Sequence, residues 1–164
     1  MWSLLIVSVM AALAAFYMRG VEQPLEGLAD RKAADLAESM AVYREAVIRY
    51  YTLNDLTNAS VSLDDLKAAN LLPAWSALKT QPGVIWRNYR DAAGTIYVYA
   101  NTLPPVNIQS ELAALSKNSH LVGAYKQAGG KLHSPVYGET TISLAALSTR
   151  GVPDNAPVWI GARQ

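Results

Sequence analysis

Two histidines are the side chains of this sequence best suited to proton transfer or metal binding near neutral pH. His120 and His133 lie in separate segments with strand character, and no acidic residue recurs at a fixed spacing beside either one. A histidine needs such a partner to act as an oriented base, or further ligands to hold a metal. We therefore expect both to be ordinary strand residues, and we predict no catalytic residue and no metal site.

The acids, serines and glycines offer no better candidate. Asp64 and Asp65 are adjacent, so on a helix their carboxylates point about 100° apart and cannot act as one pair. Asp55 and Glu111 are isolated acids that we expect in solvent. The serines form no G-x-S-x-G motif, and GVEQPLEG and QAGGK match neither phosphate-binding glycine pattern. The sequence thus predicts a protein that is not an enzyme and that binds no cofactor.

Composition narrows the range of partners. The chain has 164 residues, enough for one modest domain and an appendage, and it contains no cysteine, which excludes disulfides and thiolate metal sites. The net charge is +1, and no run of lysines or arginines occurs. Since a nucleic-acid groove needs clustered cations to neutralise phosphates, we expect no nucleic-acid partner.

The first 18 residues, MWSLLIVSVMAALAAFYM, contain no charged side chain. As a helix they would span roughly 27 Å, close to the ~30 Å hydrocarbon core of a bilayer. We predict a transmembrane anchor over residues 1–18 that contacts lipid through its large apolar side chains. These are Leu4, Leu5, Ile6, Val7, Val9, Leu13 and Phe16. The alternatives are a removed export signal, cleaved near Ala12–Ala14, and a helix buried in a soluble core.

The elements that follow predict an α+β fold. Residues 19–27 carry two glycines and a proline, so we expect the helix to break or kink there, before a globular domain over residues 28–164. A long amphipathic helix opens this domain, with apolar residues at spacings of three and four. They are Leu25, Ala29, Ala33, Leu36, Met40, Tyr43, Val47 and Tyr50.

Shorter elements complete the predicted domain. A capping box of Ser62 and Asp65 opens a helix over residues 63–72, and Asn107 precedes a second helix over residues 108–117. Hairpins are expected over residues 83–101, turning at DAAG, and over residues 120–138, turning at Gly129–Gly130; residues 156–162 form a last strand. The long helix is expected to pack on this antiparallel sheet.

Aromatic residues are expected to fill much of the core, because the single phenylalanine, Phe16, lies in the predicted anchor. Along the strand TIYVYAN, alternation places Tyr97 and Tyr99 on one face and the aliphatic residues on the other. One set should lie in the core, and the other in solvent or against a partner. Since Trp and Tyr are favoured at interfaces, Tyr97, Tyr99 and Trp75 are the candidate partner surface.

Five short segments carry a resemblance to a known family. They are MWSLLIV at the start, YREAVIRYY in the long helix, LLPAW, HSPV and PVWIG. Together they resemble the PilM proteins of type IVB thin-pilus systems on conjugative plasmids. The resemblance implies an inner-membrane component of the pilus assembly apparatus, acting in thin-pilus formation and conjugal mating. It implies no catalytic residues.

On this basis we expect a single-span inner-membrane protein whose partners are membrane lipid and other pilus-assembly proteins, with a second copy of itself as a further candidate partner. We expect the globular domain in the periplasm, although Arg19, Arg31 and Lys32 after the anchor favour the cytoplasm under the positive-inside rule. A minor pilin-like subunit of the fibre is one alternative. The apolar run begins at Met1 without the basic leader and fifth-position glutamate of a prepilin, which argues against prepilin processing. An exported envelope enzyme or ligand-binding domain is the other alternative.

Overall fold

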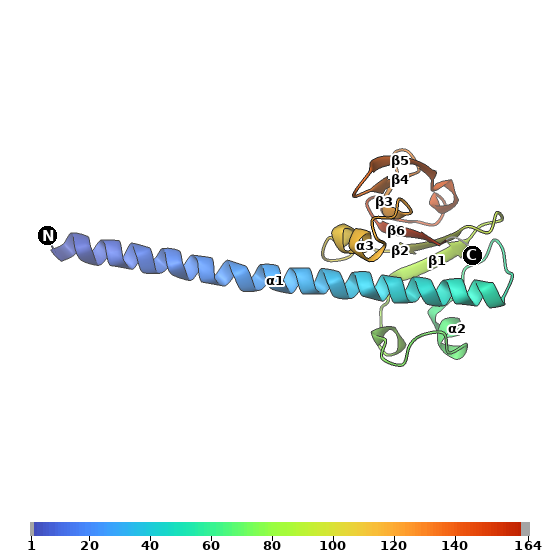
Figure 1. The fold of residues 1–164 in the computed structure, drawn as a ribbon, viewed down its shortest axis with the longest axis horizontal. Coiled ribbons are helices and arrows are strands. Elements are labelled where there is room, and N and C mark those ends of the chain that lie inside the picture. Colours follow the sequence, from blue (N-terminus) through green and yellow to red (C-terminus); the bar gives the residue numbers. More distant parts are fainter. Residues whose placement is uncertain (1, 162–164) are drawn as a thin grey trace.

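The computed structural model describes the backbone of residues 2–161 and the side chains of residues 27–161. Its first element is one long helix, α1 (Trp2–Leu53), whose C-terminal half lies along the domain while its N-terminal half extends away from it (Figure 1). The helix runs through residues 19–27 without interruption, whereas the sequence predicts a break there. Pro24 removes a single intrahelical hydrogen bond and a glycine costs only about 1 kcal/mol, so a cooperative helix with long flanks can carry both.

The packed part of α1 begins near Ala33. Leu28 is still 60% exposed, whereas Ala33, Met40, Tyr43 and Val47 of the predicted stripe are all buried. The predicted anchor over residues 1–18 lies outside the residues whose side chains are described. Among the residues described in full, no helix is long and apolar enough to cross a membrane.

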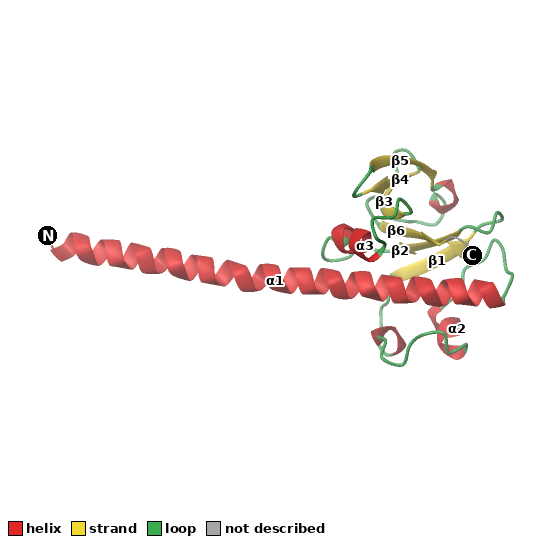
Figure 2. Cartoon of the chain, in the orientation of Figure 1, coloured by secondary structure: helices red, strands yellow, loops and turns green. Residues whose placement is uncertain are grey.

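Within residues 2–161, six strands form one antiparallel sheet in the order β1-β2-β6-β3-β4-β5 (Figures 1 and 2). The strands are β1 (Trp86–Arg90), β2 (Ile96–Ala100), β3 (Val122–Lys126), β4 (Lys131–Ser134), β5 (Gly138–Ser143) and β6 (Pro157–Gly161). Both predicted hairpins are confirmed as the pairs β1-β2 and β3-β4. Strand β6 joins them, because Trp159 pairs with Val98 on one side and with Val122 on the other. Strand β5 was not predicted: its sequence, GETTIS, holds one large apolar residue and lies at the sheet edge.

Two short helices and two 3₁₀ turns lie between the longer elements, two of them between α1 and β1, one between β2 and β3, and one between β5 and β6. They are α2 (Leu63–Ala68), α3 (Gln109–Leu115), η1 (Ala77–Lys79) and η2 (Ala145–Leu147). The capping box of α2 is confirmed, since Ser62 Oγ accepts from the Asp65 amide at 3.1 Å and Asp65 Oδ2 accepts from the Ser62 amide at 3.2 Å. The Ser62 hydroxyl also donates to Asp65 Oδ2 at 2.6 Å, and this bond, together with the one from the Ser62 amide, lowers the pKa of Asp65. At α3 the N-cap is Ile108, and Asn107 Oδ1 accepts from the Gln109 amide at 3.0 Å.

The main hydrophobic core lies between α1 and one face of the sheet. Met40, Tyr43 and Val47 of α1 meet Val98 of β2 and Trp159 of β6 in this cluster. The helix therefore packs on the sheet through the stripe that its spacing predicts. The predicted α+β class, with a long helix on an antiparallel sheet, is confirmed for the described residues.

A second core covers the opposite face of the sheet. Tyr97 and Tyr99 lie there, 7% and 6% exposed, together with Leu144, Leu147 and Val158. Because the chain from η2 to β6 covers this face while α1 covers the other, alternation along β2 does not separate a buried set from an exposed set. Tyr97 and Tyr99 therefore do not lie on a free surface, which corrects the prediction made for them.

Candidate functional site

Trp75 is the large aromatic side chain that the domain leaves most open among the described residues, at 69% exposed. It borders a groove of about 430 Å³ between α1 and the segment from Trp75 to Gln81. Helix α1 supplies one wall of this groove, which we call the Trp75 groove. Its lining residues on α1 are Lys32, Asp35, Leu36, Glu38, Ser39 and Val42.

The main chain around Trp75 is fixed although its indole is exposed. Leu72, Ser76 and Leu78 are all buried, at 3%, 6% and 1% exposure. Ser76 donates its amide to the Pro73 carbonyl at 3.1 Å, and its hydroxyl caps η1 by accepting from the Leu78 amide at 3.3 Å. A tryptophan held in this way loses little conformational freedom on binding, and tryptophan is enriched among residues that dominate interface energies.

The helix wall of the groove is fastened to the sheet. The Trp86 indole of β1 donates to Ser39 Oγ at 2.9 Å, which fixes α1 beside the groove. The lining combines apolar side chains with charges of both signs, from Lys32, Asp35 and Glu38. Its two serine hydroxyls already accept hydrogen bonds from the protein, and no histidine lines it. This chemistry suits contact with an amphipathic protein segment.

The two histidines lie apart from this groove. His120 is exposed before β3, and His133 is half-buried in β4, in register with Ala124 of β3 and Glu139 of β5. The Lys131 ammonium donates to Glu139 at 2.9 Å, and this bond lowers the pKa of Glu139. The structure thus places an acid beside His133, but that acid pairs with Lys131. Within the part of the chain described in full, no group of three or more His, Cys, Asp or Glu side chains could hold a metal.

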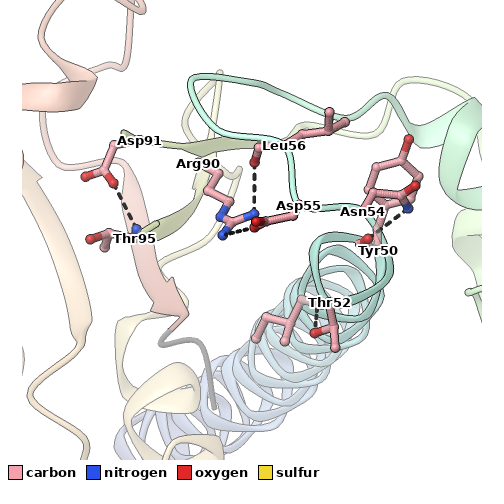
Figure 3. Close-up of polar contacts among 9 residues, drawn as sticks. Tyr50, Thr52, Asn54, Asp55, Leu56, Arg90, Asp91 and Thr95 are labelled. Carbon is pink, nitrogen blue, oxygen red and sulfur yellow. Dashed lines mark hydrogen bonds and ion pairs between the residues drawn. The ribbon is translucent and has the colours of Figure 1, made fainter. Parts of the chain in front are cut away.

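Asp55 has a structural partner that the sequence does not suggest. Arg90, buried at 2% exposure, donates from Nη2 to Asp55 Oδ1 at 3.0 Å and from Nη1 to the Leu56 carbonyl at 2.9 Å (Figure 3). Its guanidinium carbon also lies 5.6 Å from the centroid of the Tyr51 ring. Arg90 of β1 therefore holds the chain that leaves the end of α1. Asp55, expected as an isolated acid in solvent, is the carboxylate of this ion pair.

Comparison with known proteins identifies the family. The family model of PilM matches residues 8–160, from within α1 to β6. The chain belongs to the PilM family. This confirms the resemblance carried by the five short segments, and it relates the chain to pilus biogenesis.

A solved structure resembles this PilM-family chain loosely. The crystal structure of a PilM protein from Escherichia coli B7A shares 19% identity, covers 78% of this chain and 92% of its own, and gives a TM-score of 0.45. The family assignment rests on the sequence match over residues 8–160. Among curated proteins, none matches the sequence significantly.

The PilM-family domain also contains a buried polar network around Asn88 that the sequence analysis missed. Asn88 Nδ2 donates to Tyr43 Oη and to the Val61 carbonyl, both at 2.7 Å, while Oδ1 accepts from the Val61 amide at 3.0 Å and from Tyr51 at 3.2 Å. Asn88 lies two residues after Trp86 in β1 and therefore on the same face of the strand, and the Trp86 side chain lies in the main core. A lone asparagine at a core-facing strand position is the signal that could have indicated the network.

Burial favours the neutral form of the two phenols in this network. Burial raises the pKa of Tyr43 to about 12, against the smaller effect of its hydrogen bond from Asn88. Burial likewise raises the pKa of Tyr51 to about 12. At neutral pH both are protonated, so they act as hydrogen-bonding groups that hold α1 on β1 and are unsuited to accept a proton from a substrate.

Proposed function

We propose that this PilM-family chain is a non-enzymatic component of a type IVB pilus assembly apparatus. In this role it supports thin-pilus formation and conjugal mating by binding other assembly proteins. The observation that carries the proposal is Trp75, an exposed indole on a fixed main chain beside the Trp75 groove. Large exposed aromatics with rigid surroundings are characteristic of binding surfaces.

The proposal places the protein in the bacterial inner membrane by a single span over residues 1–18, with the domain in the periplasm. The uncharged sequence of that segment supports the span, and the helix α1 extends beyond the domain toward it (Figure 1). A C-terminal fusion to a reporter enzyme active only in the periplasm, compared with one active only in the cytoplasm, tests the orientation. Activity of the cytoplasmic reporter alone would overturn the periplasmic placement.

Deletion and complementation test the function. We expect a strain lacking the gene to make pilin but no thin pili and to lose mating. Full-length protein should restore both, while Trp75→Ala should restore less than about a tenth of the mating frequency at equal protein abundance, as expected for a binding hot spot. Tyr137→Ala is the matched control, because Tyr137 is 61% exposed but does not line the Trp75 groove.

Two results would count against the proposal separately. Normal piliation in the deletion strain would refute a role in assembly. Full complementation by Trp75→Ala would leave the assembly role standing but refute the Trp75 groove as the binding surface.

A minor pilin-like subunit of the fibre is a second candidate function. It is favoured by the course of α1, one half of which packs on an antiparallel sheet while the other half extends away (Figure 2). This arrangement resembles that of pilins. The presence of the protein in sheared and purified pili, in fixed ratio to the major pilin, would support this candidate, and its retention in the cell membrane would exclude it.

A further inference from the structure

A second pocket lies between α1, the residues that follow α3, and β6. Its volume is about 600 Å³, and it is distinct in its lining from the Trp75 groove. Two cations line it, Arg44 and Lys117, together with the hydroxyls of Ser116 and Ser119 and the indole of Trp159. None of its lining residues is acidic. We call it the Arg44 pocket.

The Arg44 guanidinium is held in place with its donors unused. It stacks on Trp159, with the guanidinium carbon 5.0 Å from the ring centroid. Its Nε is enclosed without a hydrogen-bond partner, and its terminal nitrogens bond to no described residue. The neighbouring Glu45 carboxylate instead accepts from Arg49 at 3.1 Å. Arg44 therefore differs from Arg90, whose terminal nitrogens are both paired within the domain.

The rest of the pocket adds positive charge and a hydroxyl donor. Lys117 is exposed in the turn after α3, where its φ of 54° belongs to the left-handed region. Ser119 Oγ accepts from the Leu121 amide at 3.2 Å, so its own proton is available to a further acceptor. An arginine, a lysine and a hydroxyl that line one pocket, with no acid among the lining residues, form a donor set suited to an oxyanion. The Trp159 indole offers an apolar surface next to that charge.

We propose that the Arg44 pocket binds a carboxylate carried by a segment of a partner protein. The Arg44 terminal nitrogens donate to the carboxylate oxygens, Lys117 supplies a second positive charge, and an apolar side chain of the same segment packs near Trp159. The inference rests on the proposed function for the source of the carboxylate. A lipid headgroup is disfavoured, because at about 1.5 Å per residue Arg44 lies about 39 Å along the helix from Met18, where the predicted anchor ends.

Nuclear magnetic resonance of the full-length protein in detergent micelles tests the pocket directly. The Arg44 side-chain Nε–H resonance is followed while two acetylated tetrapeptides are added, one ending in Leu-Phe with a free carboxylate and one containing Glu-Leu with an amidated end. We expect at least one to shift this resonance with saturation below about 10 mM. The two peptides distinguish a C-terminal carboxylate from an acidic side chain. A third peptide, the Leu-Phe peptide with an amidated end and therefore without a carboxylate, is the control and should produce no shift.

Variants of Arg44 and Arg49 test whether the Arg44 guanidinium itself, and not any positive charge on α1, binds the peptide. Arg44→Gln should weaken binding of the peptide at least about tenfold, and Arg44→Lys should weaken it less, because lysine keeps the charge but not the paired donors. In both variants the peptide is followed through the Trp159 indole resonance, whose dispersion also reports that the variant is folded. Arg49→Gln, on the same helix but paired with Glu45, should leave binding unchanged within about twofold.

Several outcomes would overturn the inference while leaving the proposed function intact. One is the absence of any shift of the Arg44 resonance with either peptide, and another is equal weakening by Arg49→Gln and Arg44→Gln. Tighter binding of inorganic phosphate than of either peptide would indicate that the ligand of the pocket is a phosphate and not a carboxylate. Binding to anionic phosphatidylglycerol vesicles that depends on Arg44 would indicate that the pocket binds lipid and not a partner protein. Loss of piliation in the deletion strain is independent of all four results.

Discussion

Replacing Asn88 by alanine is expected to be among the most destabilising changes possible in this domain. Asn88 is 2% exposed, and its side-chain amide forms hydrogen bonds with the main-chain N–H and carbonyl of Val61 and with the Tyr43 hydroxyl. Asn88→Ala leaves these three groups buried without a partner. Tyr51 is affected less, because its hydroxyl also donates to the Ala59 carbonyl at 2.8 Å.

The magnitude follows from the groups left unpaired. An unsatisfied buried polar group costs about 1–3 kcal/mol, so the two main-chain groups of Val61 alone account for several kcal/mol. We expect Asn88→Ala to lower the free energy of unfolding by about 3–5 kcal/mol, a large part of the 5–15 kcal/mol typical of a domain. Val61 should also lose its attachment to β1, whereas Ala59 keeps its main-chain hydrogen bonds with Arg90 of β1.

Urea unfolding of the full-length protein in detergent micelles, followed by tryptophan fluorescence, measures the change. Asn101→Ala is the matched control, since Asn101 is exposed after the end of β2 and its side chain forms no hydrogen bond with the described residues; its effect should stay within about 0.5 kcal/mol. A loss below about 1 kcal/mol for Asn88→Ala would refute the reasoning, because it would show that the network is not paired as the distances indicate.

The remaining predictions concern alkaline stability and strand packing. Burial raises the pKa of Tyr43 and Tyr51 to about 12 from an ordinary value near 10, so the stability they contribute is intact below pH 10 and is lost as the pH rises toward 12. The loss is a few kcal/mol at most for each tyrosine. It should coincide with tyrosinate absorbance at about 295 nm that appears later than for an ordinary tyrosine, and titration of every tyrosine near pH 10 would contradict the prediction. A methyl group on Gly123 would overlap the main-chain carbonyl of His133, so Gly123→Ala should shift β4 from β3 and lower the unfolding free energy by about 1–3 kcal/mol. Gly129→Ala, whose added carbon has no neighbour closer than 4.0 Å, is the control, and equal stability of the two variants would refute this clash.

The elements that the sequence predicts well are those with a strong local signal. The capping box at Ser62 and the β1-β2 hairpin depend on residues within a few positions of each other, and both are present. The buried stripe of α1 follows from helical periodicity over several turns. Strand β5 carries no such signal, because an edge strand needs few apolar residues and is held mainly by its pairing with β4.

The candidate functional residues divide in the same way, into those with a local sequence signal and those without one. The sequence predicts Trp75, Tyr97 and Tyr99 as contact residues, and of these only Trp75 is exposed. The two tyrosines were misplaced because alternation along one strand does not reveal whether a second layer covers the sheet. Arg44 and Asn88 were missed, since nothing in their neighbourhood along the chain shows that one stacks on Trp159 or that the other pairs with Val61.

The family follows from the match of the sequence over residues 8–160. The amino-acid sequence by itself also determined the α+β class, the uncharged segment over residues 1–18, the capping box at Ser62, the two hairpins and the face by which α1 packs. These properties depend on composition and on spacings of two to four residues, which physical periodicity converts directly into local structure. Only the tertiary structure decided which aromatics are covered and which arginine is left with unused donors. Burial and pairing arise between residues that are distant in sequence, and the free energy of a polar side chain depends on the partners that the fold brings to it.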